Sequence, residues 1–196
     1  MNHSGDLSGE FFKLIANQQL LATRTVFISE AVSSHTAKRV VTELLLLDTR
    51  EEAPIYIYVN SPGGEVTSGL AMYDTIRYLR SPVTIINTGL CASIATIINI
   101  AVPKERRCSM PNTRFLLHQP AIHGQIIGPA ADIEITATQI INTRSHLNMM
   151  LAQACGQSFH KVESDTSRDY WMNSEEALAY GLIGRIVTNA RELTRN

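Results

Sequence analysis

Hydrophobic residues along this chain alternate between short β-branched runs and longer stripes with helical spacing. Residues 24–29 and 55–59 are rich in β-branched and aromatic side chains, which is typical of strands. Between them a stripe with helical spacing follows Ser33 or Ser34, either of which suits a helix N-cap. The stripe consists of Val40, Val41, Leu44, Leu45 and Asp48.

The same alternation continues through the middle of the chain. A second helical stripe ends before Ser81-Pro82, and it is followed by an expected strand at 83–88, a helix at 93–101 and a strand at 113–117. This order predicts an α/β layer architecture in which helices cover a mostly buried sheet. The second stripe consists of Val66, Leu70, Tyr73, Ile76 and Leu79.

One helical stripe is much longer than the others. It runs from Pro129 to Cys155, and Gly156 supplies a stop signal. Such a helix would be roughly 35 Å long, which is more than a small core needs. We therefore expect it to project and its apolar stripe to favour self-association. The stripe consists of Ile133, Ala137, Ile140, Leu147, Leu151 and Ala154.

The C-terminal part of the chain predicts shorter elements. These are a helix near 158–164, a turn around 165–171, a helix opened by Asn173, and a strand at 182–187. The sequence shows no internal repeat, low-complexity tract or linker. Residues 1–196 are therefore expected to form a single domain.

Composition narrows the classes of partner. The chain is 44% hydrophobic and 18% charged, which is ordinary for a globular protein and argues against disorder. A net charge of −1 provides no strong field for phosphate backbones, so nucleic acid is not expected as a partner. The basic cluster Lys104, Arg106 and Arg107 is interrupted by Glu105 and favours a solvated turn.

The cell compartment is predicted from three features. Residues 83–102 carry no charge over a bilayer-spanning length, but a buried strand followed by a buried helix produces the same run, so no membrane partner is expected. The opening MNHSGDLSGE lacks the pattern of a secretory signal. Cys91, Cys108 and Cys155 are odd in number and widely spaced, which indicates a reducing, cytoplasmic compartment.

Two stretches at expected strand-to-helix junctions carry candidate chemistry. Residues 60–64, Asn-Ser-Pro-Gly-Gly, form either a tight turn or an anion or oxyanion site, and they match no nucleotide-binding loop. In GLCASIA, residues 89–95, Ser93 is either a small filler or a nucleophile at a helix N-terminus. Its setting resembles a nucleophile elbow, although Cys91 and Ala95 occupy the glycine positions.

A histidine at a strand end is a candidate general base. His118 ends the run FLLH, and imidazole is well suited to proton transfer near neutral pH. Asp132, Asp165 and Asp169 could each orient it, and spacing does not choose among them. The remaining histidines lack the spacing of metal ligands and are interpreted as surface residues; they are His3, His35, His123, His146 and His160.

Taken together, five ordered blocks resemble ClpP, the proteolytic subunit family of the ATP-dependent Clp protease (peptidase family S14). The similarity extends from about Thr25 to Val187. It implies a crotonase-like spiral of βαβ-type units with a projecting handle helix at about 129–155 and an N-terminal axial segment at 1–18. The blocks are YVNSPGGEVTSGLAMYDTI, GLCASIA, MPNTRFLLHQP, ADIEI and DTSRDYWMNSEEALAYGLI.

The resemblance also implies the residues of a site. It places the nucleophile at Ser93, the general base at His118 and the third catalytic residue at Asp169, and it places the oxyanion donors at the backbone N–H groups of Gly64 and Ile94. The implied activity is a serine endopeptidase that hydrolyses unfolded polypeptides inside a self-assembled chamber, in protein quality control. No metal and no cofactor of this chain are implied.

The implied partners are further copies and an ATPase. The resemblance implies two stacked heptameric rings (a tetradecamer), or a mixed ring with a paralogue. An AAA+ unfoldase would use the ATP and feed the chamber. The sequence departs from the family at its polar opening, at a stretch between His118 and Asp132 that is about two residues longer than usual, and at Gly184, where an acidic residue is frequent.

Two other functions compete with the peptidase. One is a non-catalytic or regulatory subunit of a mixed ring, which the unusual opening and loop favour and the intact Ser93, His118 and Asp169 disfavour. The other is a crotonase-fold acyl-CoA enzyme, which would use the same oxyanion geometry at Gly64.

Overall fold

A seven-stranded sheet organises the chain. The computed structural model describes residues 19–121 and 127–193. The strands are β1 (Thr25–Ile28), β2 (Ile55–Ser61), β3 (Val83–Ala92), β4 (Arg107–Ser109), β5 (Arg114–Leu117), β6 (Tyr170–Met172) and β7 (Arg185–Ile186). The helices are α2 (Ser34–Arg50), α3 (Val66–Tyr78), α4 (Ile94–Asn99), α5 (Ala130–Cys155), α6 (Phe159–Thr166) and α7 (Ser174–Tyr180), with 3-10 turns η1 (Lys104–Arg106) and η2 (Ala190–Glu192).

The central strand β3 has two different neighbours along one edge. Its residues 85–87 pair with β4, and its residues 90–92 pair with β5, both in parallel. The sheet order is β1-β2-β3-β4-β7, and β5 continues into β6 through the one antiparallel pairing among the named strands. The mostly parallel sheet with intervening helices confirms the expected α/β class.

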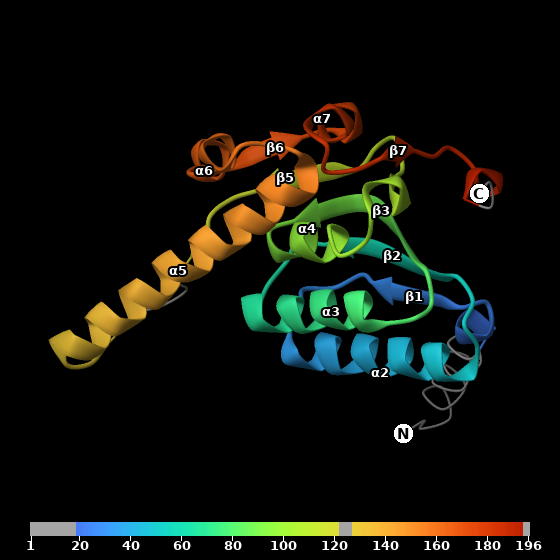
Figure 1. Cartoon of the computed structure of the whole chain (residues 1–196), viewed down its shortest axis with the longest axis horizontal. Coiled ribbons are helices and arrows are strands. Elements are labelled where there is room, and N and C mark those ends of the chain that lie inside the picture. Colours follow the sequence, from blue (N-terminus) through green and yellow to red (C-terminus); the bar gives the residue numbers. More distant parts are fainter. Residues whose placement is uncertain (1–18, 122–126, 194–196) are drawn as a thin grey trace, which may run out of the picture.

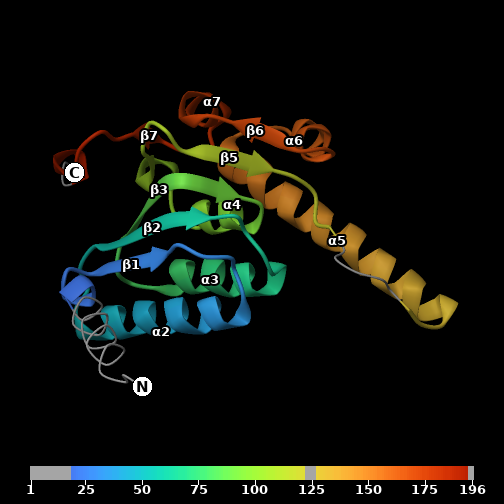
Figure 2. The same ribbon diagram turned by 180° about the vertical axis from the view of Figure 1, so that it is seen from behind.

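Helices α2, α3, α4 and α5 cover one face of the sheet (Figure 1). Figure 2 shows the strands from the other side, with these helices behind them. Side chains on β1 and β2 alternate as a half-covered sheet requires: Val26 and Ile57 are buried against the helices, whereas Phe27 is 37% exposed and stacks on Tyr58. The hydrophobic core therefore lies between the sheet and the four helices.

The predicted long helix is confirmed as α5, with Pro129 at its N-cap and Gly156 in the left-handed conformation at its C-cap. Its N-terminal half extends away from the rest of the molecule (Figures 1 and 2). Leu147 and Leu151 in the C-terminal half are buried, whereas Ile133 is 40% exposed. The apolar stripe therefore changes from core to surface along the helix.

Several element boundaries differ from the sequence-based prediction. Strand β3 continues four residues past 88, because it acquires β5 as a second partner there. Residues 170 and 171, expected in a turn, belong to strand β6 on β5, and the expected strand at 182–187 is reduced to two residues. The turn expected at the basic cluster is confirmed as η1, but Arg107, expected to be solvated there, is only 5% exposed and begins β4, a strand that was not predicted. In α2, Leu47 is buried in place of Leu45, which is 40% exposed.

The departure at Gly184 has a structural reason. A Cβ atom there would lie 2.0 Å from the carbonyl oxygen of Lys104, so the backbone of η1 occupies the space of any side chain. The Gly184 N–H also donates to the carbonyl oxygen of Arg107 (2.8 Å). Glycine therefore permits a close approach between β7 and the turn before β4.

The charge-free run at 83–102 forms strand β3 followed by helix α4, as expected. Within residues 19–121 and 127–193, no helix is both long and apolar enough to cross a bilayer. The expected axial segment at 1–18 lies outside the described residues, as do residues 122–126 of the lengthened loop, including His123.

The N-cap of α7 gives a stability prediction. The Asn173 side chain accepts from the Glu176 N–H (2.9 Å), and the Glu176 carboxylate accepts from the Asn173 N–H (2.8 Å). We expect Asn173→Ala to lower the free energy of unfolding by about 1 kcal/mol, because one N–H loses its acceptor. Urea unfolding of the parent and the variant measures this. Asn142→Ala, at an exposed site inside α5, is the control and should cost nothing.

Candidate active site

Ser93 occupies a sharp turn between β3 and α4. Its backbone has φ 56° and ψ −128°, an unfavourable conformation for a residue with a side chain. The Ser93 N–H donates to the carbonyl oxygen of Leu116 on β5 (2.9 Å), and the Ser93 carbonyl accepts from the N–H and the hydroxyl of Thr96 (2.9 and 2.7 Å). These bonds hold the turn in place. The sequence resemblance to a nucleophile elbow therefore extends to the geometry.

The Gly63-Gly64 loop packs directly on Ser93. A Cβ atom on Gly63 would lie 2.6 Å from both the Cβ of Ser93 and the carbonyl oxygen of Ala92. Both glycines have positive φ (87° and 153°). The Val32 N–H donates to the Gly63 carbonyl (2.8 Å), which fixes the loop to the segment after β1. The glycines are therefore required by contact with the serine turn as well as by the turn of their own loop.

Two backbone N–H groups adjoin the serine. Ile94 is the first residue of α4 and follows Ser93 directly, and Gly64 follows the glycine that packs on Ser93. Within the described part of the chain, neither N–H donates to another residue. Two free donors beside a hydroxyl provide the elements of an oxyanion site.

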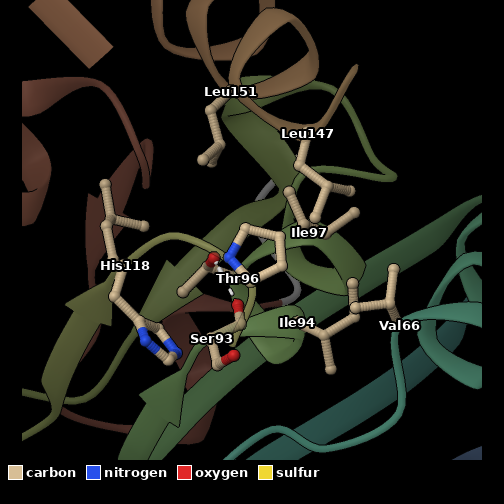
Figure 3. Close-up of a pocket in the computed structure, with 10 residues that line it drawn as sticks. Val66, Ser93, Ile94, Thr96, Ile97, His118, Leu147 and Leu151 are labelled. Atoms are coloured by element: carbon tan, nitrogen blue, oxygen red, sulfur yellow. Dashed lines mark hydrogen bonds between the residues drawn. The ribbon is translucent and has the colours of Figure 1, made fainter. Parts of the chain in front are cut away.

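His118 reaches Ser93 through the pairing of β5 with β3. The ladder aligns Leu116 with Ala92, so the residues just beyond these strand ends are neighbours. Figure 3 shows the imidazole of His118 beside Ser93, and both residues line the same pocket. Among the described residues, no hydrogen bond joins the serine hydroxyl to the imidazole.

Asp169 reaches His118 through the pairing of β6 with β5. The antiparallel register aligns Leu117 with Tyr170, and its continuation sets Asp169 opposite His118. The His118 Nδ1 lies 4.0 Å from an oxygen of Asp169, with side-chain exposures of 27% and 66%. Ser93, His118 and Asp169 therefore follow one another across three adjacent strand ends.

The contacts of the three candidate aspartates differ. Asp165 instead accepts from the Lys161 ammonium (2.8 Å) and the Tyr180 hydroxyl (2.9 Å). Asp132 lies in the first turn of α5, in the exposed projecting half. Of the three candidates, only Asp169 is in contact with His118.

A small network that the sequence did not reveal connects the histidine and aspartate segments. The Gln119 N–H donates to the Thr166 carbonyl (2.8 Å), and the Gln119 amide donates to the Ser167 carbonyl (3.1 Å). The Thr166 hydroxyl donates to the Asn148 side chain on α5 (3.1 Å). The position of Gln119 next to His118 was the only available signal for this link.

The pocket beside Ser93 is mainly apolar. Side chains from α3, α4, β5 and α5 converge on it (Figure 3), so Ser93 and His118 have mainly apolar neighbours. Its lining consists of Val66, Ser93, Ile94, Thr96, Ile97, Leu117, His118, Pro120, Leu147 and Leu151.

The other candidate residues lie outside this site. His35, His146 and His160 do not line the pocket, and His3 and His123 fall outside the described residues. Across residues 19–121 and 127–193, no three His, Cys, Asp or Glu side chains are grouped as metal ligands. All three cysteines are buried. Burial raises the pKa of Cys91, and burial raises the pKa of Cys155 to about 11, so neither thiol is activated.

Comparison with known proteins identifies relatives over most of the chain. The Clp protease family model matches residues 9–190. ATP-dependent Clp protease proteolytic subunit 2 of Pseudomonas aeruginosa is 45% identical over 174 residues, covering 89% of this chain and 86% of the relative. Proteolytic subunit 3 of Rhizobium johnstonii is also 45% identical, with 89% of each covered. A mutant ClpP1 from Listeria monocytogenes matches in structure with a TM-score of 0.85 and 38% identity, covering 91% of this chain and 99% of that one.

The strained turn at Ser93 predicts that glycine is tolerated there better than alanine. We expect the free energy of unfolding of Ser93→Gly to be about 1 kcal/mol larger than that of Ser93→Ala. Glycine relieves the strain of the positive φ, and this gain exceeds its larger loss of entropy on folding. Both variants lose the hydroxyl, so each is the control for the other. Urea unfolding measures the difference. Equal stability would mean that the turn stores no strain.

Proposed function

The chain belongs to the Clp protease family, and we propose that it is a serine endopeptidase whose nucleophile is Ser93, with His118 as general base and Asp169 as the residue that orients it. One observation carries the proposal: Ser93 and His118 line one pocket, and an oxygen of Asp169 lies 4.0 Å from His118 Nδ1. Three side chains from distant parts of the sequence are thus neighbours in the order serine, histidine, aspartate, which supports a role in acyl transfer.

The chemistry follows from these positions. His118 removes the hydroxyl proton as the Ser93 oxygen attacks a peptide carbonyl carbon, and the N–H groups of Gly64 and Ile94 stabilise the oxyanion that forms. His118 then gives the proton to the leaving amine, and an acyl-enzyme remains. Water, deprotonated by His118, releases the second product and regenerates the serine. The Asp169 carboxylate stabilises the imidazolium in each half-reaction.

Substrate binding must tighten this arrangement. The 4.0 Å separation between His118 Nδ1 and Asp169 exceeds a hydrogen bond, and the serine hydroxyl is not bonded to the imidazole among the described residues. Catalytic hydrogen bonds of enzymes without substrate are often long and shorten in the complex. Asp169 is 66% exposed, so a modest rotation of its side chain is unobstructed by the core.

The apolar pocket favours a polypeptide substrate with a hydrophobic residue beside the scissile bond. We propose that the substrates are unfolded polypeptides, because the site needs an extended segment to reach Ser93. On this proposal an AAA+ unfoldase supplies ATP-driven unfolding, this chain itself uses no cofactor or metal, and the work is protein quality control in the cytoplasm.

Assembly is part of the same proposal. The exposed apolar residues of the projecting half of α5 include Ile133, Ile135 and Ile141. Such a surface is stabilised by covering it with a matching surface of another subunit. We propose two stacked seven-membered rings, built from this chain alone or with a paralogue. The relatives carry subunit numbers 2 and 3, which is consistent with paralogues in one cell.

Removal of the serine hydroxyl tests the catalytic assignment. We expect Ser93→Ala to lower kcat for a fluorogenic peptide by about 10⁴-fold or more, because the nucleophile is lost. Ser145→Ala, on α5 outside the pocket, is the control and should keep full activity. A fluorophosphonate probe should label the parent and the control but not Ser93→Ala. An assembled parent that is never labelled would instead indicate a non-catalytic subunit.

Native mass tests the assembly. Fourteen copies of the 21.7 kDa chain would have a mass of about 300 kDa. We expect Ile135→Asp together with Ile141→Asp to reduce the assembly to single rings or smaller species, because two carboxylates would have to be buried on the projecting helix. A parent mass near one chain at micromolar concentration would contradict the ring proposal.

A further inference from the structure

A second pocket lies between α3, α5 and the segment that joins α4 to β4. It has a volume of about 290 Å³ and shares no residue with the pocket at Ser93. In Figure 1, α3, α4 and the C-terminal turns of α5 all lie on the same side of the sheet. The lining consists of Tyr73, Arg77, Ile100, Val102, Pro103, Arg107, Met150, Gln153 and Ala154.

The buried guanidinium of Arg107 is the main feature of this pocket. Arg107 is only 5% exposed, and within the described residues no carboxylate lies within 4.0 Å of it. Its Nε donates to the Val102 carbonyl (2.8 Å), and its Nη1 donates to the Ala154 carbonyl (2.8 Å). A guanidinium has five N–H donors, so donors remain on the group that lines the pocket.

A buried cation without a counter-ion is costly, because it has lost water and gained only neutral acceptors. Burial lowers the pKa of Arg107, while Cys155, Glu105 and Tyr73 act on it in the opposite direction. Among the described residues, none of the three forms an ion pair with Arg107. The pocket is therefore lined by a buried guanidinium that no carboxylate of these residues contacts directly.

A second guanidinium faces the same space. Arg77 lines the pocket from α3, and its guanidinium carbon lies 5.6 Å from the centre of the Tyr73 ring. This contact favours a position of Arg77 at the pocket. The remaining polar side chains of the lining are the phenol of Tyr73 and the amide of Gln153, both of which can donate hydrogen bonds. The lining contains no carboxylate.

We propose that this pocket binds the phosphoryl group of a small molecule, between the guanidinium groups of Arg77 and Arg107. A phosphate dianion would supply the missing counter-charge and has enough acceptor oxygens for two guanidinium groups, a phenol and an amide. The apolar lining from Ile100, Val102 and Met150 would contact the organic part of the ligand. Because the pocket is separate from Ser93, the proposal does not depend on peptidase activity.

Ligand binding here would connect parts of the active-site pocket. Arg107 ties the segment after α4 to the last turn of α5 through its two carbonyl acceptors. Both helices also reach the pocket at Ser93: α4 begins next to Ser93, and α5 contributes Leu147 and Leu151 to the lining. An anion on Arg107 would therefore stabilise the packing of two helices that also shape the candidate active site.

Thermal unfolding and calorimetric titration of the full-length protein at pH 7 test the proposal, with inorganic phosphate as the probe. We expect phosphate to raise Tm saturably, whereas chloride and acetate at equal ionic strength should not. Arg77→Gln should weaken phosphate binding by about tenfold, because one charge-assisted contact is lost. Gln153→Glu should abolish it, because a carboxylate of nearly equal shape repels the anion.

Controls separate this pocket from general charge effects. Arg50→Gln removes the same charge at the exposed end of α2 and should bind phosphate like the parent. Arg77 and Gln153 are both exposed, so their variants should fold even if a change at the buried Arg107 does not. Equal stabilisation by acetate, unchanged binding in Arg77→Gln and Gln153→Glu, or an equal loss in Arg50→Gln would each overturn the proposal.

Discussion

Two hydrogen-bonded ladders on either side of β5 place the candidate site. The parallel ladder to β3 ends where Ser93 begins, and the antiparallel ladder to β6 ends where Asp169 begins. His118 follows β5 directly and so lies between them. A register shift of one residue on either side would point a side chain to the opposite face of the sheet. Backbone pairing between strands therefore sets the arrangement of the candidate site, and no contact among the three side chains is needed for it.

The close packing of Gly63 against Ser93 depends on the same sheet. Strands β2 and β3 are parallel neighbours, so their carboxyl ends deliver the glycine loop and the serine turn to one edge. Gly63 and Ser93 lie so close together that a Cβ on Gly63 would not fit, and Ser93 itself has a positive φ. Strain and close approach here are local costs that the surrounding ladder offsets.

The sequence predicted most of the elements, because buried parallel strands and amphipathic helices leave clear patterns. Pro129 and Gly156 bounded the long helix, and Asn173 with Glu176 marked a cap, since these residues act locally. The choice among Asp132, Asp165 and Asp169 could not be made from spacing, for a physical reason. Residues 170–172 are stabilised as a strand by β5, a partner about fifty-five residues earlier, and local patterns carry no record of such pairing.

The second pocket also could not be predicted from local sequence patterns. Arg107 belongs to a basic cluster that favours a solvated turn in the sequence, yet its side chain is buried beneath α5 and hydrogen-bonded to Ala154, forty-seven residues away. The sequence shows that Arg107 carries a charge but not which residues surround it. Its environment, a buried guanidinium that lines one pocket with Arg77 and without a carboxylate, arises from packing among α3, α5 and the segment after α4. In this chain, both the candidate active site and the proposed phosphoryl site are products of tertiary contacts acting on residues whose local signals are weak.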